Sequence, residues 1–168
     1  MKKLTKIKLV NWHLFANETV EIQDNAILSG ENGSGKSTLL DAIQYLLVGG
    51  RGGVKFNVAA NEDAKRSLEG YVRGRLGAED REFLRPNDVI THVALEFYDE
   101  EDDTYNILGV ILDLPKGANI KERFYILEDI SIDDALFLDG NYPRDYRSMR
   151  DFLKTMGREL RPYDTQKA

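Results

Sequence analysis

The first 30 residues alternate between apolar and polar positions, and this alternation predicts short strands. Residues 4–10 and 18–22 combine β-branched side chains with a two-residue period, and the link between them is short enough for a hairpin. A turn at residues 24–25 precedes a brief apolar run at 26–28, which predicts a third strand ending just before Gly30. The chain is therefore expected to open with a hairpin and one further short strand.

A helical period replaces the alternation from Lys36 onward. One apolar stripe is formed by residues at i, i+1, i+4, i+7 and i+8, namely Leu39, Leu40, Ile43, Leu46 and Leu47. Gly49 and Gly50 are expected to end this helix, with residues 49–53 as a loop. A second helix is predicted to begin after Asn61 as its N-cap. Its predicted buried side consists of Leu68, Val72 and Leu76.

The middle of the chain returns to the two-residue period. Residues 89–98, 104–114 and 120–127 predict three strands. Because short turns join them, they favour an antiparallel meander. The first of these turns, residues 99–103, is a run of acidic side chains, which we interpret as a solvated turn rather than a metal site.

One more helix is predicted near the C-terminus, over residues 143–156. Pro143 suits its first position, and Gly157 is expected to end it. The predicted fold class is thus α/β, with a mixed sheet that contains an antiparallel meander and with flanking helices.

Composition narrows the possible functions. A chain of 168 residues is long enough for one domain with its own core, and a net charge of −6 argues against nucleic-acid binding through the whole surface. Contact with nucleic acid would therefore be local or depend on partner chains. The absence of cysteine excludes a disulfide framework and a thiolate metal site. No apolar run approaches the roughly 18 residues of a membrane helix, and the first residues do not form a signal peptide, so we expect a cytoplasmic protein without membrane contact.

The segment that carries chemistry is Gly30-Glu31-Asn32-Gly33-Ser34-Gly35-Lys36-Ser37. It matches the P-loop pattern G-x-x-x-x-G-K-[ST] at every fixed position, and it stands between a predicted strand and a predicted helix. Glycines in such a loop let successive N–H groups point at an anion, and the helix N-terminus adds its positive dipole end. The sequence therefore predicts a site for the phosphates of a nucleoside triphosphate, with Mg-ATP as the expected ligand.

Each residue of the loop has an expected role. Lys36 is expected to reach the β- and γ-phosphates, Ser37 to bind Mg²⁺ through its hydroxyl, and Thr38 to hydrogen-bond the α-phosphate. The remaining predicted contacts come from the loop itself: Asn32, Gly33, Ser34 and Gly35.

Hydrolysis needs more than this loop. An acid must hold Mg²⁺ from a Walker B strand, and a further residue must orient the attacking water. The nearest candidate is Asp113 after Val110-Ile111-Leu112, but its strand belongs to the predicted meander and no second acid follows it. Residues 124–129 and 136–139 are no better matches, and we interpret all three segments as structural. The sequence predicts half of an ATPase site.

The arrangement of hairpin, P-loop and helix resembles a known family. The run Gly30-Glu31-Asn32-Gly33-Ser34-Gly35-Lys36-Ser37, followed by Leu39-Leu40-Asp41-Ala42-Ile43, is similar to the N-terminal head half of SMC-type coiled-coil ATPases. Residues 11–15, 55–57 and 70–74 look closest to the MukB-like branch, which includes the MksB/JetC subunits of bacterial condensins and of Wadjet-type plasmid defence. The resemblance is sharp over residues 1–76 and only architectural over 88–157.

The resemblance implies partners and an organisation. A head of this family is assembled from the two ends of one chain, and the C-terminal half supplies the signature and Walker B motifs. Two heads enclose two ATP molecules, and head engagement, with kleisin and accessory subunits, drives DNA loop extrusion. Residues 1–168 would then form the N-terminal half of an ABC/SMC-type head. Its parts would be a P-loop lobe at 1–80, the meander at 88–138, and a helix at 143–157 that leads toward a coiled coil.

Some family features have no clear counterpart. A Q-loop glutamine is expected between the lobes, yet the glutamines are Gln23, Gln44 and Gln166, none of which is well placed. Arg51 either corresponds to the family's γ-phosphate arginine or is a solvated loop residue. His13 either faces the nucleotide base or packs inward.

Two neighbouring aromatic residues are given core roles. Trp12 and Phe15 stand near the end of the first predicted strand, where aromatic rings at such spacing usually pack inward.

Two other classes compete with the half-head. One is a self-contained P-loop NTPase or kinase that uses Asp113 as its Walker B acid. Its parallel sheet would need helices between successive strands, which the meander lacks. The other is an interaction module without turnover. Single-turnover hydrolysis separates these classes.

Overall fold

A computed structural model of the protein describes residues 1–49, 67–76 and 81–163. In this part of the chain one six-stranded sheet has the order β2-β1-β3-β4-β5-β8, and every strand pair is antiparallel. Its strands are β1 (Lys2–Trp12), β2 (Phe15–Glu21), β3 (Val89–Asp99), β4 (Thr104–Leu114), β5 (Lys121–Leu127) and β8 (Arg161–Pro162). The predicted hairpin and meander are confirmed.

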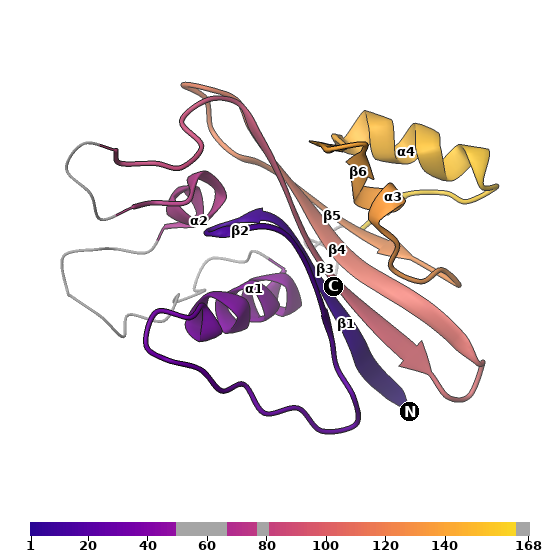
Figure 1. Cartoon of the computed structure of the whole chain (residues 1–168). Helices are drawn as coiled ribbons and strands as arrows, with labels where there is room; N and C mark the ends of the chain where they lie inside the picture. The colour runs from indigo at the N-terminus through magenta and orange to yellow at the C-terminus, as the bar shows by residue number, and fades with distance from the viewer. Residues whose placement is uncertain (50–66, 77–80, 164–168) are drawn as a thin grey trace.

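Helices cover both faces of this sheet. Figure 1 shows α1 (Lys36–Val48) and α2 (Leu68–Arg73) on one side, and α3 (Asp134–Phe137) and α4 (Tyr146–Thr155) on the other. A small hairpin of β6 (Leu138–Asp139) and β7 (Tyr142–Pro143) lies with the second pair. The chain is therefore an α/β protein with an antiparallel sheet between two layers of helix.

The alternation along the strands separates two apolar clusters. On β4, Val110 and Leu112 pack with the α1 and α2 side, whereas Ile107 and Ile111 pack with the α3 and α4 side. Buried aromatic rings complete both clusters, with Trp12 on the first side and Tyr125 on the second. Side chains at even and odd positions of one strand thus belong to different faces.

The acidic turn between β3 and β4 is tied to the N-terminus. Lys2 lies 3.6 Å from the Asp99 carboxylate, and Lys3 lies 2.6 Å from that of Glu100.

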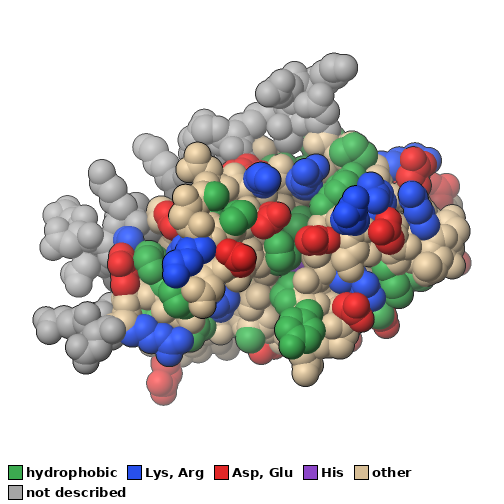
Figure 2. All heavy atoms as spheres, turned by 90° about the horizontal axis from the view of Figure 1, so that it is seen from above, with side chains coloured by type: hydrophobic (Ala, Val, Ile, Leu, Met, Phe, Trp, Pro, Cys, Tyr) green, Lys and Arg blue, Asp and Glu red, His purple; other side chains and the backbone are tan. Residues whose placement is uncertain are grey.

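Seen from above, the surface carries acidic and basic side chains next to one another (Figure 2). Among the described residues, the face seen in Figure 2 therefore shows no extended patch of one charge sign.

The segment before the P-loop differs from its prediction. Residues 26–28 form no strand, and the Ile27 side chain is 94% exposed. A strand exists only where a neighbour receives its hydrogen bonds, and the described chain places no strand beside this segment. The described sheet therefore contains antiparallel pairs only, whereas a mixed sheet was predicted.

Two helices begin at residues other than those predicted. The last helix begins at Tyr146 rather than at Pro143, because the Asp145 side chain caps it by accepting from the Ser148 N–H, and Pro143 belongs to β7. The helix that contains Val72 starts after Ser67 as its N-cap, while the predicted cap Asn61 lies outside the described residues.

The buried face of α1 is shifted relative to the predicted stripe. Leu39 and Leu46 are buried, but Leu40 and Leu47 are 50% and 59% exposed. The face toward the sheet is completed by residues that the predicted stripe does not include, namely Thr38, Asp41, Ala42 and Tyr45.

Candidate functional site

The P-loop leads from the exposed segment 26–30 into the first turn of α1. Gly33 and Gly35 have φ angles of 85° and 96°, which glycine adopts without the strain of a side chain. Gly35 is the N-cap of α1, and no side chain caps this turn in the described structure. The first N–H groups of the helix are thus left for a ligand.

The Lys36 ammonium group is held inside the loop. Its Nζ donates to the carbonyls of Gly30 at 2.5 Å and Glu31 at 2.8 Å, and to the Ser34 hydroxyl at 3.3 Å. The positive charge therefore already lies in the curve of the loop. A phosphate that enters the loop would meet this charge.

The Phe15 ring of β2 packs against the P-loop at Gly35. A Cβ atom at Gly35 would lie 2.8 Å from the Cζ atom of Phe15, closer than such atoms approach. The half-buried Phe15 ring packs on the core of the α1 side, in agreement with its predicted role. Gly35 is needed here both for its φ angle and for this contact.

Buried aromatic residues fix the first turns of α1. The Trp12 Nε1–H donates to the carbonyl of Thr38 at 3.0 Å, and the fully buried indole confirms the predicted core role. Tyr71 of α2 stacks on Trp12 with a centroid distance of 4.6 Å and an interplanar angle of 6°. The Tyr71 hydroxyl donates to the Asp41 carboxylate of α1. Sequence analysis assigned no role to Tyr71 or Asp41.

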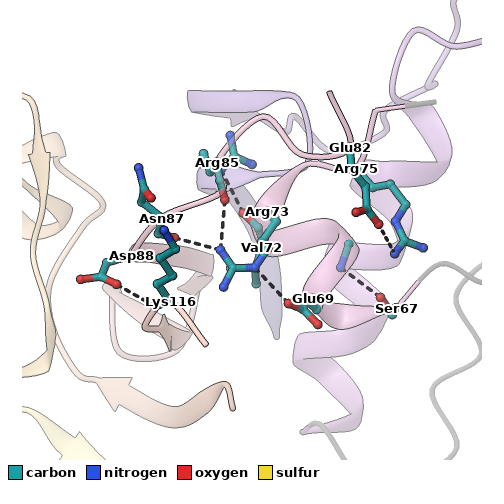
Figure 3. A network of polar contacts seen from close by, with 11 residues as sticks. Ser67, Glu69, Val72, Arg73, Arg75, Glu82, Arg85, Asn87, Asp88 and Lys116 are labelled. Atoms are coloured by element: carbon teal, nitrogen blue, oxygen red, sulfur yellow. Dashed lines mark hydrogen bonds and ion pairs between the residues drawn. The ribbon is translucent and has the colours of Figure 1, made fainter. Parts of the chain in front are cut away.

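Arg85 joins the hairpin end to α2, and Figure 3 shows its side chain beside Val72 and Arg73 of α2. Its guanidinium donates to the carbonyls of Val72 at 2.9 Å, Asn11 at 3.2 Å and His13 at 2.5 Å. Burial lowers the pKa of Arg85 to about 10, so the side chain keeps its charge at neutral pH. Arg73 makes a similar set of bonds to the carbonyls of Arg85 and Asn87.

Five further residues considered in the sequence lie in different places. His13 stands in the β1–β2 turn with φ 50°, and its ring lies 5.6 Å from that of Tyr71. Whether it faces a nucleotide stays a prediction. Arg51 and Gln166 lie outside the described residues. Gln44 is exposed on α1, and Gln23 lines an open hollow of about 780 Å³ beside the N-terminus.

Asp113 lies on the wrong face for a Walker B acid. Its neighbours Leu112 and Leu114 pack on the α1 side, so the side chain between them points to the α3 and α4 side. There Asp113 lines a hollow of about 390 Å³ together with Asp139. The sheet therefore separates both acids from the P-loop.

The remaining candidate for a Walker B strand, residues 124–129, is bound to the C-terminal segment by ion pairs. The carboxylates of Glu128 and Asp129 bind Arg161 at 3.0 Å and Arg158 at 3.1 Å. Their interpretation as structural residues agrees with these contacts.

The donors present fit a magnesium–nucleotide polyphosphate. An anion would meet the Lys36 ammonium, the uncapped first turn of α1 and the two left-handed glycines, which together form a cationic cradle. Ser37, half-buried in the same turn, would supply a hydroxyl to Mg²⁺. The bound metal would neutralise phosphate charge, while this chain would bind and orient the phosphates.

Comparison with known families agrees with this geometry. Residues 4–63 match the family described as the P-loop containing region of AAA domain, which covers a little over a third of the chain. The comparison with curated proteins gives no match. The α/β fold, the loop geometry and this match are consistent with a P-loop NTPase fold, and they support nucleotide binding at this loop. Among the described helices, none has the length and apolar character needed to cross a membrane.

Proposed function

We propose that this chain is the Mg-ATP-binding N-terminal half of an SMC-like ATPase head of the MukB-like branch. In this proposal a C-terminal half of the same protein supplies the signature motif and the Walker B acid. The completed head hydrolyses ATP in the cytoplasm, as part of a bacterial condensin or a plasmid-defence complex. Kleisin and accessory subunits, a second head and DNA are its partners.

The observation that carries the proposal is the position of Asp113. The P-loop lies on the α1 and α2 side of the sheet. Asp113, the nearest candidate for a Walker B acid, lies on the α3 and α4 side. Hydrolysis needs an acid beside the Mg²⁺ that the phosphates bind. A C-terminal half that supplies its own Walker B acid on the P-loop side would provide what Asp113 cannot.

Exposed apolar residues on the P-loop side support the same proposal. Ile27 and Leu28 precede the loop, and Leu40 and Leu47 lie on the side of α1 that faces away from the sheet. A helix that is apolar on both sides normally packs on both sides. The segment 26–28, predicted as a strand, would gain its hydrogen-bonding neighbour from the proposed C-terminal half.

Single-turnover hydrolysis with the chain in excess over Mg-ATP tests the proposal. Wild type, Lys36→Ala and Asp113→Asn are compared, with Lys36→Ala as the background. We expect all three to hydrolyse ATP at the rate of this background, because no Walker B acid reaches the site. Hydrolysis by the wild type that is lost in Asp113→Asn would instead establish a self-contained NTPase.

A further inference from the structure

Tyr71 is linked to α1 directly through its hydroxyl and indirectly through Trp12. Its ring lies flat against Trp12, whose Nε1–H donates to the Thr38 carbonyl at 3.0 Å. Its hydroxyl donates to the Asp41 carboxylate. All three side chains are buried: Trp12 is 0%, and Tyr71 and Asp41 are each 1% exposed. Tyr71 therefore contacts α1 directly at Asp41, and it packs on the β1 side chain that holds Thr38.

Thr38 and Asp41 both lie within the first two turns of the helix. Thr38 and Asp41 are three residues apart, so they lie on the same side of α1 in successive turns. Lys36 and Ser37, the expected ligands of the phosphates and Mg²⁺, belong to the turn that Trp12 holds. Rotation of α1 about its axis would break both contacts and would turn these ligands away from the loop.

Tyr71 is itself anchored independently of α1. Its carbonyl accepts from the His13 N–H at 2.6 Å, and Arg85 binds the carbonyls of Val72 and His13. Ser67 caps α2 by accepting from the Gly70 N–H at 3.0 Å. The anchor of Tyr71 thus consists of the hairpin end, α2 and Arg85.

We infer that Tyr71 is a positioning residue of the nucleotide site, which acts through Asp41 and Trp12 on the first turn of α1. The inference rests on the proposed nucleotide binding. Fixing α1 before the ligand arrives removes an ordering cost from binding. Because coupling between two events is reciprocal, bound Mg-ATP must in turn hold α2 more firmly against α1.

Tyr71→Phe tests this with little change in shape, since the stacked ring remains and only the hydroxyl is lost. Tyr125→Phe is the matched control. It removes a hydroxyl from another fully buried tyrosine, on the α3 and α4 side, that has no hydrogen-bond partner among the described residues. Circular dichroism establishes that each variant folds, and Asp41→Asn, which weakens the same hydrogen bond, replaces Tyr71→Phe if that variant does not.

Two readouts are compared: the dissociation constant for Mg-ATP by calorimetry, and amide hydrogen exchange in α2 with and without Mg-ATP. We expect Tyr71→Phe to weaken binding on the order of 10-fold and to lose the nucleotide-induced protection of α2. Tyr125→Phe should keep both wild-type values.

The outcomes separate this inference from the function on which it rests. A wild-type chain that does not bind Mg-ATP overturns the proposed function and the inference with it. A wild type that binds, next to a Tyr71→Phe variant with the same affinity and the same α2 protection, overturns only the inference.

Discussion

At the scale of single residues, two glycines of the loop carry different constraints. Gly33 and Gly35 both have positive φ angles. A Cβ atom at Gly33 would meet nothing within 4 Å, whereas one at Gly35 would lie 2.8 Å from the Phe15 ring. Alanine at Gly33 therefore brings backbone strain alone, and alanine at Gly35 brings strain and a steric clash.

We expect Gly33→Ala to lower the free energy of unfolding by about 1–2 kcal/mol. Gly35→Ala should lower it by roughly 1–3 kcal/mol more, because the Phe15 ring must move. It should also weaken Mg-ATP binding more, since the displaced loop precedes Lys36. Urea denaturation and calorimetry on both variants check this. Equal stability and affinity of the two variants would show that the Phe15 contact does not constrain the loop.

Residues differ in how far the sequence reveals their roles. Lys36 and the glycines could be predicted because phosphate binding requires them at fixed spacing. Trp12 and Phe15 could be predicted as core residues from their position beside a strand. Arg85 could not be predicted, because its partners are main-chain carbonyls, which leave no pattern in the sequence.

At the scale of elements, His92 joins β3 to the layer of α3 and α4. Its Nε2–H donates to the Arg144 carbonyl at 2.8 Å, and its ring meets that of Phe137 edge-on at 5.4 Å. The side chain is fully buried, and burial lowers the pKa of His92 to about 4. The folded protein thus holds this histidine neutral.

This predicts a loss of stability in mild acid. The unfolded chain takes up the His92 proton near pH 6.5, but the folded chain resists it down to about pH 4. Between these values the unfolded state binds more protons than the folded state. The free energy of unfolding therefore decreases as the pH is lowered, by about 3 kcal/mol in total. Urea denaturation at pH 7, 5.5 and 4.5 measures this fall.

His92→Gln is the control, because its amide N–H can replace the Nε2 donor without a charge. It should remove most of the decline above pH 4.5. Glu96 contributes separately: burial alone would raise its pKa, but hydrogen bonds from Ser131, Ile132 and Thr5 hold the pKa below its usual value. Its contribution is lost only at lower pH. Wild type and His92→Gln with the same pH dependence would contradict the assignment.

Elements whose pattern is local could be predicted, and those that depend on neighbours could not. The strands of the meander follow from alternation and short turns, and β4 has the predicted bounds. The run at residues 26–28 has strand propensity but no neighbour in the described sheet, so it forms no strand. The start of α4 could have been read from Asp145, a good N-cap that Pro143 outweighed.

At the scale of the whole molecule, the P-loop and the nearest Walker B candidate lie on different sides of the sheet. On one side α3 and α4 cover the sheet. On the other, α1 leaves apolar residues exposed next to the phosphate cradle. The sequence predicted both the cradle and the lack of a matching acid, but only the structure shows that Asp113 lies across the sheet from the loop. Further assembly on the P-loop side is the proposal that the separation of Asp113 from the loop supports.

The central claim is that the loop from Gly30 to Thr38 binds Mg-ATP through Lys36. Calorimetric titration of Mg-ATP into wild type, Lys36→Ala and the control Lys154→Ala, an exposed lysine on α4, tests it directly. Saturable binding to wild type and Lys154→Ala is predicted, with none to a Lys36→Ala variant that unfolds at the wild-type temperature. An unchanged dissociation constant in Lys36→Ala would contradict the claim.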